Sequence, residues 1–150
     1  MHSVRGDVAN PLATGVMGAL MQHSLKGRRD RCEVKALESL PGGEQQDAHC
    51  DGKWDDPAYS DATTADRILY SAVLALEHGT KVIMLPEGKH GPEKEVLLNP
   101  GDLLVFRGDC WHAGASYDSR NVRAHLYVTA PGYRRSRNAT YSYFLVYWRR

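Results

Sequence analysis

The sequence predicts a mainly β fold, a sandwich or barrel of short strands, with one N-terminal helix packed on a sheet. The strongest sign is the region after residue 30, where short β-branched, aromatic and aliphatic runs alternate with turns rich in Gly, Pro and Asp. A helical spacing of apolar residues occurs once, before residue 27. Because no helical pattern separates the later strands, a parallel βαβ arrangement is not expected.

Length and composition fit one globular domain that occupies residues 1–150. The chain is 42% apolar and 25% charged, which is ordinary for a globular protein and excludes a disordered, collagen-like or coiled-coil chain. The 19 Lys and Arg residues nearly balance the 18 acids, so bulk charge does not predict a polyanionic partner. Basic clusters at 26–29, 134–137 and 149–150 leave nucleic acid possible as a partner, but solvated surface charge is the favoured interpretation.

The sequence predicts an intracellular, cytoplasmic protein with no membrane partner. No window reaches the roughly 20 apolar residues that a membrane-spanning helix needs. The apolar run over 11–21 has some likeness to a signal peptide, but Asp7 spoils its basic flank and no small-x-small cleavage pattern follows. The 3 cysteines are odd in number and lack C-x-x-C spacing, so reducing conditions are expected. The oligomeric state is left open.

The helix is expected over about 11–26. Asn10 is a preferred N-cap residue, and Pro11 suits the first helical position because its φ is already fixed near the helical value. Apolar residues then recur at helical spacing in two neighbouring rows, which are Leu12, Val16 and Leu20 beside Met17, Met21 and Leu25. We interpret this stripe as the face that packs on a sheet.

The β core is expected over about 32–130, with one more strand at about 140–148. Its strands are expected at 32–39, 68–76, 81–85, 95–98, 103–106, 110–113 and 122–129. Residues 77–80 predict one hairpin, and the tight turn at 107–109 predicts another that carries His112 to the end of a buried strand. Residues 52–66 read as a polar loop, in which Trp54 is a substrate-side lid candidate and Tyr59 is better interpreted as an anchor.

The first candidate for chemistry is the sequence His49-Cys50-Asp51. In a strand, residues i and i+2 point to the same side, so His49 and Asp51 converge while Cys50 faces away as a small buried residue. One imidazole and one carboxylate make two thirds of a 2-His-1-carboxylate metal site. Such a pair is also common in surface loops, so the pattern needs a third ligand to gain weight.

His112 is the candidate third ligand. It opens the strand that follows a Pro-Gly turn, an apolar strand and a second tight turn. A lone histidine at this place is more often a hydrogen-bonded core residue, but one that faces an H-x-D pair completes a metal site. Cys110 lies two residues earlier and would share the face of His112.

The strand at 122–129 alternates between an apolar and a polar face. The apolar positions, Val122, Ala124, Leu126 and Val128, need a packing partner, for which the N-terminal helix is a candidate. The polar face carries Arg123, His125 and Tyr127, and we expect these residues to line a cavity. A guanidinium in a cavity needs an anion, which is either a ligand or a structural partner such as Asp102 or Asp109. His125 and Tyr127 are therefore substrate-side candidates.

Taken in order, these segments resemble the Fe(II)/2-oxoglutarate-dependent dioxygenases. The resemblance covers about residues 32–130 and is carried by Pro41-Gly42-Gly43, His49-x-Asp51, Arg67 to Leu76, Gly88-Lys89-His90, Pro100 to Phe106, His112-Ala113-Gly114 and Arg123. It implies a double-stranded β-helix, a jelly-roll or cupin-like barrel. It also implies His49, Asp51 and His112 as iron ligands and catalytic residues, and Arg123 on the distal carboxylate of 2-oxoglutarate. Arg120 competes with Arg123 for this role, and Tyr70 is a further candidate for the co-substrate site.

The resemblance implies Fe(II), 2-oxoglutarate and O₂ as cofactor and co-substrates. The implied reaction oxidises a C–H bond of an unidentified substrate, small or macromolecular, and forms succinate and CO₂. Two alternatives stay open. One is a cupin-type metalloenzyme that does not use 2-oxoglutarate, although such sites usually carry more histidines or a glutamate soon after the first. The other is a β-helix module that binds a metal or ligand without turnover.

Overall fold

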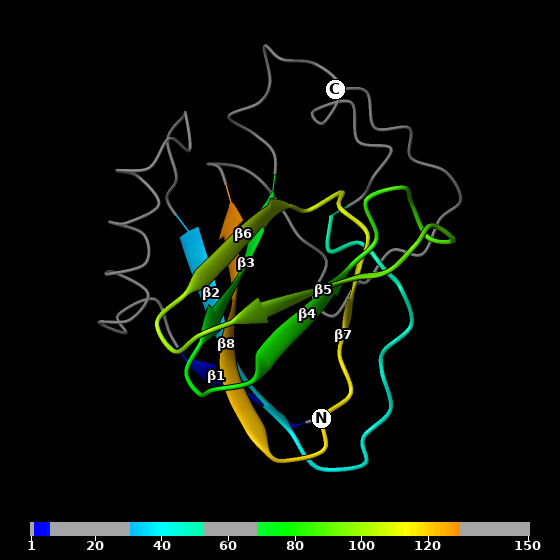
Figure 1. Cartoon of the computed structure of the whole chain (residues 1–150). Coiled ribbons are helices and arrows are strands. Elements are labelled where there is room, and N and C mark those ends of the chain that lie inside the picture. The colour runs from blue at the N-terminus through cyan, green and yellow to red at the C-terminus, as the bar shows by residue number, and fades with distance from the viewer. Residues whose placement is uncertain (1, 7–30, 53–68, 130–150) are drawn as a thin grey trace.

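The structure is a computed structural model, and it describes residues 2–6, 31–52 and 69–129 (Figure 1). Within these ranges the chain forms strands and no helix. The strands are β1 (His2–Gly6), β2 (Arg31–Ser39), β3 (Tyr70–Ala75), β4 (Thr80–Met84), β5 (Lys94–Leu98), β6 (Leu103–Arg107), β7 (His112–Gly114) and β8 (Asn121–Thr129). The expected helix at 11–26, the C-terminal strand at 140–148, and Trp54 and Tyr59 in the long loop lie outside the described residues.

The strands form two antiparallel sheets, which Figure 1 shows facing each other. The larger sheet has the order β1-β2-β8-β3-β6, and the smaller has the order β5-β4-β7. In the larger sheet β8 is central, with Lys35 of β2 opposite His125 on one side and Val73 of β3 opposite the same residue on the other. Every inward-facing residue of β8 therefore has a neighbour from another strand.

The connections give the order of a jelly roll. A single antiparallel bridge between His49 and His112 adds residues 49–50 to the free edge of β7. From β2 onward the chain crosses to the other sheet after every segment except β4, which is followed by its own pairing partner β5. Strands β2, β3, β6 and β8 lie in the larger sheet, and residues 49–50, β4, β5 and β7 lie in the smaller one. The mainly β, double-sheet fold is thus as predicted.

Neither predicted hairpin is present. Strand β3 pairs with β6 and β8, whereas β4 pairs with β5 and β7, so residues 77–80 cross from one sheet to the other. The same holds for β6 and β7 on either side of the turn at 107–109. The turn itself lies where the sequence predicts it, and Gly79 within it has a φ of 76°. The partner of each strand is instead decided by which faces bury apolar residues.

Two apolar clusters set the position of the cavity. Between the sheets, residues of four strands pack together, namely Val73, Ala75, Val82, Leu98 and Phe106. On the opposite face of the larger sheet a second cluster contains Val34, Ala72, Ala124, Leu126 and Val128. The predicted alternation of β8 is therefore observed, and its polar face points between the sheets. No helix in the described ranges is long and apolar enough to span a membrane.

Candidate metal centre

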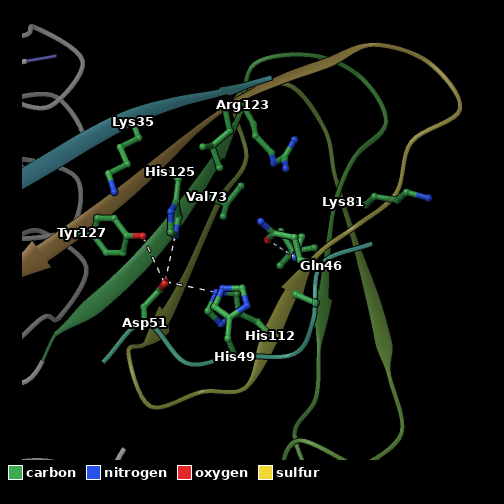
Figure 2. Close-up of a pocket in the computed structure, with 14 residues that line it drawn as sticks. Lys35, Gln46, His49, Asp51, Val73, Lys81, His112, Arg123, His125 and Tyr127 are labelled. Atoms are coloured by element: carbon green, nitrogen blue, oxygen red, sulfur yellow. Dashed lines mark hydrogen bonds and ion pairs between the residues drawn. The ribbon is translucent and has the colours of Figure 1, made fainter. Parts of the chain in front are cut away.

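His49, Asp51 and His112 come together at the edge of the smaller sheet (Figure 2). Their nearest ligand atoms all lie within 4.8 Å of one another. Two backbone hydrogen bonds join the two histidines. The His49 amide donates to the His112 carbonyl at 2.9 Å, and the His112 amide donates to the His49 carbonyl at 3.0 Å. The ring centroids are 4.5 Å apart. The three residues singled out as a metal site thus form one cluster.

The two imidazoles are held in the tautomer that a metal ligand needs. Nδ1 of His49 lies 2.8 Å from the carbonyl of Asp47, and Nδ1 of His112 lies 3.0 Å from the carbonyl of Cys110. A carbonyl can only accept, so each Nδ1 carries the proton and each Nε2 presents a lone pair. Hydrogen bonds of this kind orient the ring and raise its basicity as a ligand.

Asp51 is 1% exposed and is held from the larger sheet. Its Oδ2 accepts a 2.6 Å hydrogen bond from the Ser71 hydroxyl and lies 3.3 Å from Nε2 of His125. The Tyr127 hydroxyl lies 3.5 Å from the other oxygen, Oδ1. Nε2 of His112 is 3.4 Å from Oδ2. The carboxylate therefore sits between the histidine ligands on one side and three polar side chains of β3 and β8 on the other.

Two pKa values favour metal binding at neutral pH. Burial opposes ionisation of Asp51, but the hydrogen bond and charge interaction with His125, with smaller contributions from His112 and Ser71, hold its pKa well below the ordinary value. Burial lowers the pKa of His112 to about 4, against the opposing effect of Asp51. The site thus offers a carboxylate and a neutral imidazole, the forms that a divalent cation requires.

The triad opens into a cavity of about 180 Å³ between the sheets. Arg123, His125 and Tyr127 of β8 line it, as the alternation of that strand predicted (Figure 2). Asp51 is the sole carboxylate among its described lining residues. Apolar walls come from both sheets, including Leu37, Val73 and Val82.

Arg123 is a buried cation in this cavity. It is 3% exposed, its Nη1 donates to the Ser39 hydroxyl at 3.1 Å, and its guanidinium lies 5.1 Å from the centre of the Tyr117 ring. Burial lowers its pKa, and Tyr117 opposes that shift. Within the described ranges it makes no ion pair with a carboxylate, so neither suggested structural partner is used. Asp109 pairs with Arg107 at 2.7 Å, and Asp102 accepts from the Asn99 amide at 2.8 Å.

Arg120, the other candidate for the co-substrate carboxylate, lies elsewhere. It is exposed and pairs with Glu38 and Glu77. Of the two arginines, only Arg123 lines the cavity.

Tyr70 is placed differently from the prediction. Alternation along β3 turns Ser71 and Val73 inward, whereas Tyr70 packs against the apolar cluster on the far face of the larger sheet. Tyr70 is not among the residues that line the cavity, so its expected role at the co-substrate site is corrected. The hydroxyl that β3 supplies to the site is that of Ser71, and it bonds to Asp51.

Cys50 and Cys110 lie outside the cavity. The Cys50 thiol is buried and donates to the Asp109 carbonyl at 3.3 Å, and burial raises its pKa. Cys110 was expected near the metal, but it packs against the apolar cluster between the sheets. Burial raises its pKa to about 11, so the thiol stays protonated. Its contribution to the site is the carbonyl that fixes His112.

Several lining residues were not identified from the sequence. Lys35 lies directly opposite His125, and Gln46 hydrogen-bonds the Gly114 amide at 3.0 Å through its side chain. Ser71 and Lys35 each follow the period of two in their strands. Once β8 is recognised as the central strand, that period would identify both.

No protein-family model matches the sequence, and no curated protein matches it either. Solved structures do match. A prolyl-4-hydroxylase from Pseudomonas putida superposes with a TM-score of 0.55 at 22% identity, over 79% of this chain and 63% of that one. A prolyl 4-hydroxylase structure from Phytophthora capsici superposes with a TM-score of 0.59 at 14% identity, over 86% of this chain and 48% of that one. The chain thus spans less than two thirds of either structure, and the likeness shows that it has the jelly-roll fold of these prolyl hydroxylases.

Proposed function

We propose that this chain is an Fe(II)- and 2-oxoglutarate-dependent dioxygenase. The observation that carries the proposal is the pairing, in one cavity, of the His49–Asp51–His112 cluster with the buried guanidinium of Arg123. Burying a charge without a partner is costly, so Arg123 calls for an anionic ligand. The distal carboxylate of 2-oxoglutarate supplies that anion while the other end of the molecule reaches the metal.

The donor set fits a ferrous ion. Two imidazoles and one carboxylate would hold the ion as a 2-His-1-carboxylate set, which would leave positions open for 2-oxoglutarate and O₂. Iron bound there supplies the chemistry in which O₂ converts 2-oxoglutarate to succinate and CO₂ while a substrate C–H bond is oxidised. The likeness to prolyl hydroxylases in fold supports oxygenase chemistry of this kind. The substrate is a separate question.

The residues around the triad and Arg123 have distinct tasks in the proposed reaction. His49 and His112 present Nε2, and Asp51 adds a negative charge that partly neutralises the cation. Ser71 and His125 hold the carboxylate in place from the larger sheet. Arg123 orients 2-oxoglutarate by a bidentate contact that a lysine does not reproduce. Apolar side chains of both sheets, including Leu37, Val73 and Val82, line the same cavity.

Co-substrate binding and product formation separate this proposal from the alternatives. A cupin-type metalloenzyme without 2-oxoglutarate would use the buried Arg123 only for an anionic substrate of its own. A module without turnover would keep metal binding but form no product. The deciding experiment adds 2-oxoglutarate to the Fe(II) protein without oxygen and looks for a visible charge-transfer band, then admits O₂ and measures succinate. Absence of the band with intact Fe(II) binding would favour the cupin-type alternative, and a band without succinate would favour the binding module.

A further inference from the structure

The cavity holds a second cation that the proposed reaction does not use. Lys35 of β2 lines the cavity, and its side chain is 12% exposed. Its ammonium lies 4.9 Å from the centre of the Tyr127 ring. Its one ionic partner within the described ranges is Glu33 at 3.7 Å, and the Glu33 side chain is 48% exposed. An ion pair that faces water on one side compensates a buried charge weakly.

Lys35 and Arg123 serve different parts of the cavity. Lys35 lies directly opposite His125 across the β2–β8 ladder, and Arg123 is opposite Leu37. The lysine lies over the ring of Tyr127, whereas the arginine lies over the ring of Tyr117. Figure 2 shows the two head groups on opposite sides of His125, with the metal cluster beside them. One carboxylate bound to Arg123 therefore leaves Lys35 with the half-exposed Glu33 as its ionic partner in the described ranges.

We propose that the primary substrate is a small organic acid whose anionic group binds Lys35. This inference rests on the proposed dioxygenase function and names the class of substrate. An anion on Lys35 would place the neighbouring carbon atoms along Tyr127 and His125, both of which contact Asp51. The cavity of about 180 Å³ is below the usual range of ligand pockets, which favours a small molecule.

Lys81 provides a matched control on the same cavity. It also lines the cavity, and its ammonium lies 5.7 Å from the Tyr117 ring. It pairs with Glu95 at 3.4 Å, and Figure 2 shows its head group pointing away from the metal cluster. Lys81→Met therefore removes the same charge from the same cavity without removing the proposed anion contact.

The test measures binding of matched pairs of small molecules to the Fe(II) protein with 2-oxoglutarate in the absence of oxygen. The panel contains amino acids and hydroxy acids, each beside its carboxamide, and phosphate monoesters, each beside the parent alcohol. Perturbation of the charge-transfer band reports occupancy next to the metal. We expect at least one acid to bind more tightly than its neutral partner. Lys35→Met should weaken the binding of that acid by about tenfold or more, and Lys81→Met should leave its binding unchanged.

The outcomes separate this inference from the function on which it rests. A missing band in the unaltered protein means that the dioxygenase proposal has failed. If the band forms but no acid binds more tightly than its neutral partner, the substrate class is wrong. The same conclusion follows if Lys35→Met and Lys81→Met weaken acid binding equally. If Lys35→Met instead weakens 2-oxoglutarate itself, Lys35 belongs to the co-substrate site and the inference is overturned.

Discussion

His49 and His112 face each other across one antiparallel bridge, and each ring is fixed in the same way. In both residues Nδ1 lies within hydrogen-bond distance of the carbonyl two residues earlier, at 2.8 Å and 3.0 Å respectively. Two segments far apart in the sequence therefore use one local geometry to direct both Nε2 atoms to a single point. This repetition favours the interpretation of the two histidines as metal ligands, because ligating imidazoles are usually oriented by such a hydrogen bond.

Removal of either imidazole should abolish iron binding. Changes in groups that merely orient a ligand cost 10–100-fold in metal affinity, so His49→Ala and His112→Ala should each cost more than about 100-fold. The anaerobic Fe(II)–2-oxoglutarate band should disappear while far-UV circular dichroism stays unchanged. His78→Ala, on an exposed turn, is the control. Full iron affinity in both ligand variants would refute the metal assignment.

Arg123→Lys should weaken the binding of 2-oxoglutarate far more than the binding of Fe(II). Lysine keeps the charge but loses the two parallel hydrogen bonds, and an unmade charged hydrogen bond costs about 1.5–3 kcal/mol, or roughly ten- to 150-fold. Titration of 2-oxoglutarate into the anaerobic Fe(II) protein measures the change. Arg120→Lys should have no effect, since Arg120 lies outside the cavity lining. Unchanged co-substrate affinity in Arg123→Lys would remove Arg123 from the co-substrate site.

His125→Ala should impair turnover without unfolding the protein. The substitution removes a contact of 3.3 Å to Oδ2 of Asp51 and leaves the Ser71 and Tyr127 hydroxyls to orient the carboxylate from the larger sheet. Fe(II) affinity should fall by roughly tenfold, within the range for groups that orient a ligand. His125→Gln, which keeps a donor, should restore part of it. If activity and the thermal midpoint instead fall in proportion in both variants, His125 is structural.

The metal-free protein should lose stability on mild acidification. The pKa of His112 is 6.5 in an unfolded chain and about 4 in the folded one, because burial disfavours the charged ring. Above the higher value both states are neutral and the contribution is complete. Between the two values the unfolded chain binds a proton that the folded chain does not, so the free energy of unfolding falls by about 3 kcal/mol. Urea titrations across this window should show the slope, and His112→Gln should flatten it.

Gly114→Ala should disturb the segment that carries two of the ligands. A Cβ at this position would lie 2.4 Å from Oε1 of Gln46, so the glutamine must move and its 3.0 Å bond to the Gly114 amide is lost. We expect a loss of about 1–2 kcal/mol in the free energy of unfolding. A double-mutant cycle with Gln46→Ala checks the cause, because the second substitution removes the clash. Additive losses would show that the two residues are not coupled.

Much of the site could be predicted because its information is local. The i, i+2 relation joins His49 to Asp51, and the same relation along β8 joins Arg123, His125 and Tyr127. His112 is marked by the turn that precedes it. In each case a period of two and a turn are enough to orient the side chain, whichever strand lies beside it.

The pairing of strands was less accessible from sequence. Residues 77–80 have the composition of a hairpin turn, yet they join strands of different sheets because β8 lies next to β3. Tyr70 was misplaced for a related reason, since its face depends on the registration of β3 against β8. Lys35 was overlooked because a lysine in a strand usually marks the solvent side. Partner choice is settled by burial at long range, which no local window contains.

The jelly roll divides the work of the cavity between its two sheets. The histidines that would hold iron belong to the edge of the smaller sheet, whereas Arg123 and Lys35, the proposed partners of anionic groups, belong to the larger one. Asp51 connects the two sheets, because it follows His49 in the chain and contacts Ser71, His125 and Tyr127 of the larger sheet. Replacement of side chains on β2 can therefore change what is recognised without moving the histidines. A change in the distance between the sheets, in contrast, would displace the Asp51 carboxylate from its partners on the larger sheet.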